Sequence, residues 1–285
     1  YKKQKNKMKK LVTLLFAGIF AFSATAQELP KPSPTGNVGQ KIGLTNVNIE
    51  YSRPSAKGRT IFGGLVPFDE MWRLGANMAT QLEISTPITI GGKELAKGEY
   101  SMQAIPSKNG DWIIVINSDA NLSGLSGYDE KKDIVRINAK AMVNSFTESF
   151  TIGFDKITAT SAVITIKWEK LNVEIPFTVN TEGIAKENIA TAIKEGKELD
   201  KVYSRAASYF SDMKEYKTAL MYVDKSLNIN KTHQAMFTKA NIYKAQENME
   251  DAIKSGKEAL ELANKAESKG WANYIEKNIK VWEEK

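Results

Sequence analysis

The spacing of apolar residues changes once along the chain, close to residue 183, and this change constrains the fold more than any other feature. Before it, apolar and polar residues alternate in short segments separated by glycine, asparagine and proline, which is typical of β-strands joined by tight turns. After it the chain contains no proline, and apolar residues recur every three or four positions, which is typical of amphipathic helices. The chain of 285 residues therefore predicts two domains of different class.

Residues 40–182 predict the β domain. Alternation is clear in segments such as 163–168, and residues 112–116 form a continuous apolar run. Asn109-Gly110 predicts a hairpin turn, because both residues tolerate positive φ. About eight strands with no helix of useful length between most of them predict an antiparallel sandwich or barrel, and the pattern does not distinguish the two.

The second domain, residues 183–285, is predicted to be all-α. Ala206 and Tyr209 recur as Ala240 and Tyr243, 34 residues later. A small alanine lets a neighbouring helix approach closely, and the tyrosine fills the space beside it. This pattern resembles the tetratricopeptide repeat, whose period is 34 residues, and it predicts stacked helical hairpins. A generic bundle of helical hairpins is the alternative.

The first 26 residues predict a secretory signal peptide. They hold six lysines and no acid, followed by the apolar run Leu11–Ser23 and the small residues Ala24-Thr25-Ala26. As a helix the apolar run measures about 20 Å, against roughly 30 Å of bilayer hydrocarbon, so an uncleaved anchor is the weaker alternative. We expect a chain exported to the periplasm or cell envelope, or secreted, with no membrane span after cleavage and with residues 27–39 as an extended, proline-rich lead-in.

Composition excludes several function classes. With no cysteine and one histidine, His233, the chain has no disulfide, no thiol chemistry and no cysteine-based metal site. Without the lysines of the first 26 residues, 34 basic and 33 acidic residues remain, so the positive surplus that nucleic-acid binding requires is missing. The sequence also lacks a phosphate-binding glycine loop and the common zinc-protease and serine-hydrolase motifs. We expect no cofactor and no metal ion, and we expect a protein that is not an enzyme.

Several unusual strings lie in the β domain. The most specific is Trp72-Arg73-Leu74-Gly75-Ala76-Asn77. The others include Tyr51-Ser52-Arg53-Pro54, Lys57-Gly58-Arg59, Lys97-Gly98-Glu99-Tyr100 and Asp133-Ile134-Val135-Arg136. Together, over roughly residues 38–180, they resemble a domain of unknown function from exported bacterial proteins. The resemblance implies a secreted β-domain, sometimes followed by tetratricopeptide-like helices, and implies no activity. Where that family tends to have an aromatic-rich turn, this chain has the small residues of 123–127.

The same strings supply the candidate binding residues, because arginines in loops shaped by glycine and proline present a fork of donors to a carboxylate or phosphate. The candidate ligand-binding residues are Arg53, Arg59, Trp72, Arg73, Asn77 and Arg136. In the competing interpretation, the arginines form internal ion pairs with Asp69, Glu70 or Asp133. Trp72 and Asn77 likewise have structural alternatives, in the core and as a turn cap.

One motif predicts a calcium loop. Asp119, Asn121, Ser123 and Glu130 have the spacing of the oxygen ligands in such a loop. The flanking segments are predicted strands and not helices, which favours a simple polar connection between strands. A calcium-stabilised adhesive module remains the alternative for this loop.

These observations favour an exported, non-enzymatic binding or scaffolding protein. The helical repeats would bind a protein partner, and the β domain a small anionic or glycan ligand; no nucleic acid is expected. The alternative is an extracytoplasmic hydrolase of glycan or ester substrates. It would use carboxylates near Arg73, such as Asp69, Glu70 or Asp133, as acid and base.

Overall fold

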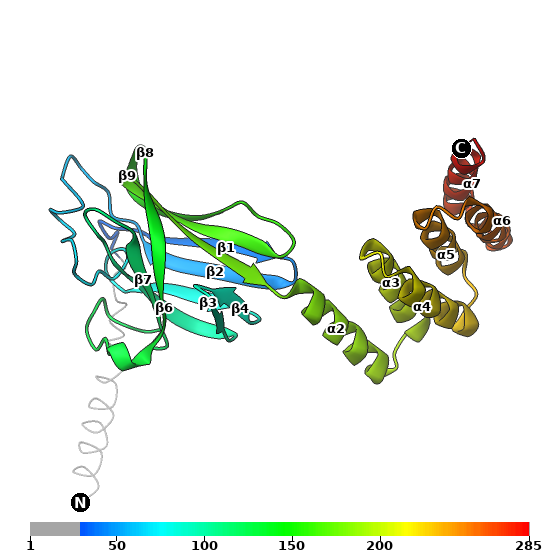
Figure 1. Ribbon diagram of the computed structural model, residues 1–285, viewed down its shortest axis with the longest axis horizontal. Coiled ribbons are helices and arrows are strands. Elements are labelled where there is room, and N and C mark those ends of the chain that lie inside the picture. The colour runs from blue at the N-terminus through cyan, green and yellow to red at the C-terminus, as the bar shows by residue number, and fades with distance from the viewer. Residues whose placement is uncertain (1–28, 285) are drawn as a thin grey trace, which may run out of the picture. The chain divides into compact units, whose positions relative to one another are not determined.

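The computed structural model describes residues 29–284, so the predicted signal peptide lies outside the described residues. In this range nine β-strands precede six α-helices, which confirms the predicted fold class (Figure 1). Backbone contacts divide the chain into two compact units. The β unit comprises the chain up to residue 40 with residues 46–157 and 161–178, and the helical unit comprises residues 41–45, 158–160 and 179 onward. None of the helices within residues 29–284 is long and apolar enough to cross a bilayer.

The β unit is built on one antiparallel sheet. Its strands are β1 (Thr35–Ile42), β2 (Thr45–Ser52), β3 (Thr80–Ile84), β4 (Ile88–Ile90), β5 (Lys93–Leu95), β6 (Gly98–Ile105), β7 (Trp112–Asn117), β8 (Asp133–Asp155) and β9 (Ser161–Val179). They lie in the order β1-β2-β3-β6-β7-β8-β9-β4-β5. β1 already begins within the segment predicted to be an extended lead-in.

The length of β8 lets a single sheet enclose a core. The first part of this 23-residue strand pairs with β7 and the remainder with β9, and its register shifts between Val143 and Thr147 and again before Thr151. Such bulges bend a strand and increase its twist. The sequence left sandwich and barrel open; the strands form one continuous sheet that β8 carries around the core.

A bridge between the end of β2 and the middle of β8 closes part of this sheet. The amide of Ala56 donates to the carbonyl oxygen of Glu148 at 2.8 Å, and the amide of Phe150 donates to that of Pro54 at 2.8 Å. The segment after β2 is thereby held over the core, and it carries Arg53 and Arg59.

Aromatic side chains fill the core beneath this segment. Trp72 stacks on Trp168 with ring centroids 5.9 Å apart and meets Phe150 edge-on at 5.3 Å. Trp112 and Trp168 are each 1% exposed, as expected for inward-facing strand positions. Offset-stacked and edge-to-face contacts of this kind add to the stability that burial itself supplies. The long connection between β2 and β3 is therefore anchored through Trp72.

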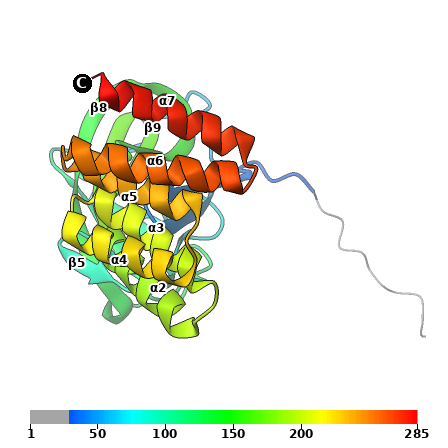
Figure 2. The same ribbon diagram turned by 90° about the vertical axis from the view of Figure 1, so that its right-hand side faces the viewer.

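The helical unit is a series of six helices, each joined to the next by three residues. They are α2 (Thr181–Glu195), α3 (Leu199–Asp212), α4 (Tyr216–Ile229), α5 (His233–Ala245), α6 (Met249–Lys265) and α7 (Lys269–Glu283). Figure 2 shows these helices stacked from α2 to α7. Their starts are capped as expected: the side chains of Asn180, Thr232 and Asn248 each accept a hydrogen bond from a backbone amide of the first turn.

The turns after α3 and α5 have the same geometry. The amide of Glu215 donates to the carbonyl oxygen of Phe210, and 33 residues later that of Asn248 donates to Tyr243. Tyr243 therefore corresponds to Phe210 and not to Tyr209, so the 34-residue pairing drawn from the sequence is wrong by one residue. Ala219 and Ala252, both fully buried, follow the same 33-residue spacing.

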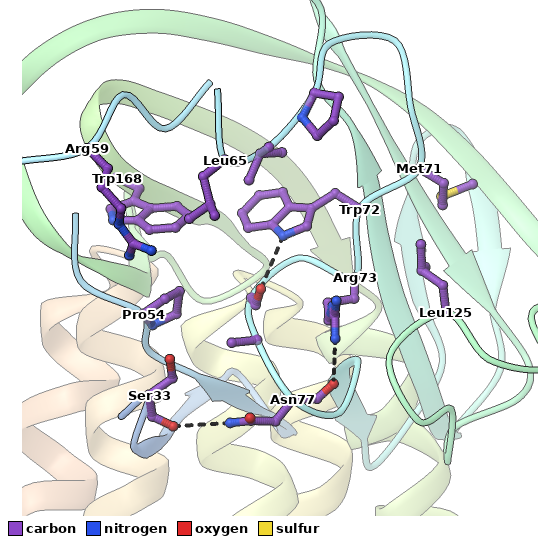
Figure 3. Close-up of a pocket in the computed structure, with 14 residues that line it drawn as sticks. Ser33, Pro54, Arg59, Leu65, Met71, Trp72, Arg73, Asn77, Leu125 and Trp168 are labelled. Carbon is purple, nitrogen blue, oxygen red and sulfur yellow. Dashed lines mark hydrogen bonds between the residues drawn. The ribbon is translucent and has the colours of Figure 1, made fainter. Parts of the chain in front are cut away.

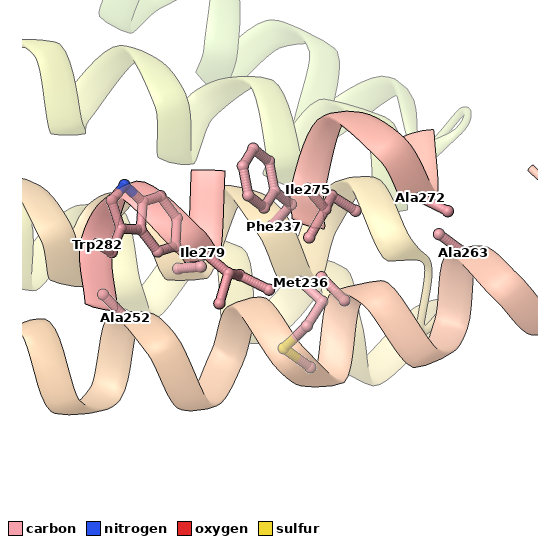
Figure 4. Packing of buried hydrophobic residues seen from close by; sticks show 10 residues of the cluster. Met236, Phe237, Ala252, Ala263, Ala272, Ile275, Ile279 and Trp282 are labelled. Carbon is pink, nitrogen blue, oxygen red and sulfur yellow. The ribbon is translucent and has the colours of Figure 1, made fainter. Parts of the chain in front are cut away.

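The end of the helical unit has its own apolar core, in which α7 packs on α5 and α6. Phe237 of α5 stacks on Trp282 of α7 with centroids 5.8 Å apart and planes at 9°. Ile275 and Ile279 fill the space between the two helices and α6 (Figure 4). Gly256 of α6 lies beneath Trp282, where the missing side chain allows the close approach.

Candidate functional site

A cavity of about 380 Å³ opens in the β unit beside the segment 72–77. Arg59, Trp72, Arg73 and Asn77, four of the six candidate residues, line it (Figure 3). Arg59 and Arg73 stand on two sides of the cavity, with Leu65 and Trp72 between them. The structure thus brings together residues that are up to 18 positions apart in the sequence.

The segment 72–77 holds its shape through buried contacts and an unusual backbone. Trp72 bridges Ala104 of β6 with two backbone hydrogen bonds, at 2.7 and 2.8 Å, and its indole Nε1 donates to the carbonyl oxygen of Gly75 at 3.1 Å. Leu74, which is fully buried, has a φ of 53°, and Asn77 has a φ of 58°. Left-handed backbone at a bulky residue costs free energy and tends to occur at functional sites.

Asn77 positions the loop. Its side-chain amide donates to the carbonyl oxygen of Ser33 at 3.2 Å and to the hydroxyl of Ser52 at 3.1 Å. These bonds tie the loop to the segment before β1 and to the end of β2. The turn-holding interpretation of this residue is therefore the better supported one, and its amide is already used.

The guanidinium groups of Arg59 and Arg73 are bonded only to backbone oxygens. Arg59 donates to the carbonyl oxygens of Ala56 at 3.0 Å and Ser55 at 2.7 Å. Arg73 donates to the carbonyl oxygen of Asn77 at 3.3 Å. Among the residues that the structure describes, no carboxylate lies within ion-pair distance of either group. Both positive charges therefore face the cavity without a compensating acid.

Arg53 lies on the other side of its segment and acts within the fold. Its Nε donates to the carbonyl oxygen of Phe150 at 3.1 Å, and its terminal nitrogen donates to the hydroxyl of Thr151 at 3.0 Å. Both partners belong to β8, so Arg53 strengthens the bridge between β2 and β8. It does not line the cavity.

Arg136 also lies outside the cavity, in an ion-pair network. Its guanidinium is 2.8 Å from the carboxylate of Asp133 and 3.2 Å from that of Glu130. The hydrogen bond to Asp133 raises the pKa of Arg136. The internal ion pairs considered for all the arginines are thus formed by Arg136 and not by Arg53, Arg59 or Arg73 within the described residues.

The acids considered for catalysis are not assembled around the cavity. Asp69 and Glu70 are exposed and belong to the loop before Trp72, and none of the residues lining the cavity is an aspartate or glutamate. Asp133 accepts hydrogen bonds from Asn117 at 2.8 Å and from Tyr128 besides pairing with Arg136. The site can hold an anion through its arginines; a carboxylate pair for acid and base work is not present in it.

Sequence reasoning missed the apolar part of the site. Leu65, Met71 and Leu125 line the cavity beside the arginines. Leu125 belongs to the loop 123–127, and Gly124 of the same loop packs against the guanidinium of Arg73. The small residues of that loop, a departure from the family pattern, were the available signal, because glycine permits this close approach.

The calcium-loop motif is engaged in other contacts. Asp119 bonds the ammonium of Lys132 at 3.0 Å, which lowers the pKa of Asp119. Glu130, the last expected ligand, pairs with Arg136. Over residues 29–284, no group of three histidine, aspartate or glutamate side chains is arranged to hold a metal ion.

The fold and the cavity together define a class: a protein with an antiparallel β unit, which carries an arginine-lined cavity, followed by a unit of helical hairpins. Residues 33–177, just over half of the chain, match the model of the family described as protein of unknown function (DUF2911). The chain belongs to this family, as the resemblance of the Trp72–Asn77 segment to a domain of unknown function implied. No curated protein and no solved structure matches the chain.

Proposed function

We propose that the chain is an exported binding protein of the cell envelope whose β unit holds a small anionic ligand. The observation that carries this proposal is the pair Arg59 and Arg73, whose charges face one cavity and are bonded only to backbone carbonyl oxygens. A guanidinium in this state retains N–H donors for a carboxylate or phosphate, and charge-assisted bonds of this kind are the strong ones. Export is supported by the lysine-rich start, the apolar run and the small residues at 24–26.

Thermal unfolding of the full chain with a panel of anions tests this ligand site. A ligand that binds only the folded state raises the melting temperature in proportion to its affinity and concentration. We expect at least one of citrate, galacturonate, glucose 6-phosphate and octanoate to stabilise the wild-type chain more than the double variant Arg59→Gln/Arg73→Gln. Equal shifts in both proteins for every anion would overturn the proposal.

We further propose that the helical unit binds a protein partner, as tetratricopeptide-like hairpins do. The recurrence of the same turn and the same buried alanine after 33 residues supports this assignment. On α7, Trp271 is 36% and Tyr274 is 55% exposed, and both touch Phe237 of α5. Exposed aromatic side chains on a rigid helix are typical anchors of protein interfaces.

Affinity capture from an envelope extract tests the partner proposal. The bait is the full chain, and the variant is Trp271→Ala/Tyr274→Ala, with Met221→Ala on α4 as a control for an exposed apolar residue. We expect a partner that is retained by the wild type and the control and lost by the double variant. A set of captured proteins that is the same for all three baits would contradict it.

A further inference from the structure

The surroundings of the two arginines narrow the class of ligand. Apart from the guanidinium groups, the accessible side chains at the cavity are aliphatic: Leu65 is 48% and Leu125 is 37% exposed, and Met71 is half-buried between them in exposure class. Two leucines left open to solvent beside unpaired cations are costly unless a ligand covers them. The cavity therefore offers a charged and an aliphatic surface to the same ligand.

Aromatic rings, in contrast, are not available as a platform for a sugar. Trp72 is 8% and Trp168 is 1% exposed, and both are stacked in the core of the β unit. A sugar ring needs an open aromatic face, whereas an aliphatic chain needs only an apolar surface. The glycan ligand considered from the sequence is for this reason the weaker choice at this cavity.

The size of the cavity sets the size of the ligand. Taking the roughly 30 Å³ that one water molecule occupies in the liquid, 380 Å³ corresponds to about a dozen non-hydrogen atoms. This suits a carboxylate that carries a medium-length aliphatic chain or a single aliphatic side chain.

Resting on the proposed function of the same site, we propose that the ligand is an aliphatic carboxylate. Its carboxylate would lie between Arg59 and Arg73, and its aliphatic part would cover Leu65, Met71 and Leu125. Two sources supply this chemistry: the head of a fatty acid, and the C-terminus of a peptide that ends in an aliphatic residue. Arginine suits either one, because its planar fork matches the two oxygens of a carboxylate.

Isothermal titration of the full chain with five probes tests the proposal. Octanoate represents the fatty acid and N-acetyl-leucine the peptide end; octan-1-ol and N-acetyl-leucine amide are their neutral counterparts, and galacturonate is a sugar carboxylate. We expect octanoate or N-acetyl-leucine to bind about tenfold or more tightly than its neutral counterpart and than galacturonate, since one charge-assisted pair is worth at least such a factor. The stronger of the two identifies the source.

Variants separate the charged from the aliphatic contribution. Arg59→Gln/Arg73→Gln should weaken the binding of the carboxylate about tenfold or more, while Arg136→Gln, which lies outside the cavity, should leave it unchanged. Leu65→Ser/Leu125→Ser should weaken the aliphatic carboxylate and leave galacturonate unaffected; because both leucines are exposed, the fold tolerates this change, and thermal unfolding checks that it does.

The outcomes are distinguishable. Galacturonate binding more tightly than both aliphatic carboxylates, or aliphatic binding that the leucine variant does not change, overturns the assignment of the ligand class and leaves the anion site in place. If no anion binds, or if the arginine variant binds as well as the wild type, the ligand class and the proposed anion site are both wrong.

Discussion

The phenolic hydroxyl of Tyr128 lies 3.0 and 2.8 Å from the two carboxylate oxygens of Asp133, to which it donates its proton. The same carboxylate pairs with Arg136. Burial first, and then the hydrogen bond and charge of Asp133, raise the pKa of Tyr128 to about 12. Here an arginine, an acid and a phenol satisfy one another, whereas Arg59 and Arg73 at the cavity have no such partners among the described residues.

This relationship predicts a dependence of stability on alkaline pH. A phenol whose pKa is higher in the folded chain than its ordinary value of about 10 contributes stability that is complete below pH 10 or so. That contribution is lost as the pH rises through the window between the two pKa values, because the unfolded chain loses its proton first. We expect urea unfolding to show a steeper loss of stability over this window in the wild type than in Tyr128→Phe. Parallel curves for the two proteins would contradict the raised pKa.

Two arginines with different surroundings are expected to differ in their effect on folding. Arg53→Gln removes two hydrogen bonds that hold β2 to β8, and we expect it to lower the free energy of unfolding by about 1–3 kcal/mol. Arg73→Gln removes a single bond of 3.3 Å at an exposed side chain, and we expect a change within about 0.5 kcal/mol. Chemical denaturation of both variants measures this. An Arg73 variant as unstable as the Arg53 variant would assign Arg73 to the fold.

Asn77 offers a test of the backbone at the cavity. Asn77→Ala and Asn77→Gly both lose the bonds to Ser33 and Ser52, but only glycine adopts a φ of 58° without a steric cost. We expect the alanine variant to be less stable than the glycine variant by about 1 kcal/mol in urea unfolding. If alanine is tolerated as well as glycine, the loop does not have the left-handed conformation described.

Gly256 tests the packing of α6 on α7. A Cβ atom at this position would lie 3.1 Å from Ile279 and 3.2 Å from Trp282, so the two methyl groups of a valine have no room. We expect Gly256→Val to destabilise the helical unit by about 1–3 kcal/mol, measured by the thermal loss of helical circular dichroism. Gly270→Ala is the matched control, because an added Cβ there meets no atom within 4 Å. A valine variant that melts with the control would place α7 elsewhere.

The order of strands and helices follows from periodicity, which is a local property. Alternation assigned Trp112 and Trp168 to the core, and apolar spacing of three and four assigned the helices. The pairing of β8 with both β7 and β9 was not predictable, because it depends on bulges at Val143 and Thr147 that no local pattern marks. The one-residue error in the helical repeat arose because Tyr209 and Phe210 are adjacent aromatic residues and only the turn geometry separates them.

The candidate site was predictable in part. Residue type singled out the arginines, but their surroundings depend on distant segments. Arg53 and Arg59 are six residues apart in the sequence, yet one contacts β8 and the other lines the cavity. The contribution of Leu125 is likewise a product of tertiary structure, since the loop 123–127 reaches the cavity only after β7 and β8 have paired.

The most direct test of the account uses the small number of arginines in the chain. With five arginines, Arg205 being the fifth, the side-chain Nε–H groups give five signals in a nitrogen–proton correlation spectrum of the labelled protein, each assigned by its glutamine variant. On titration with octanoate, the account predicts that the signals of Arg59 and Arg73 shift together and saturate, while those of Arg53 and Arg136 stay in place. Signals of Arg59 and Arg73 that remain unmoved by octanoate, galacturonate and citrate alike, or that shift no more than that of Arg136, would contradict it.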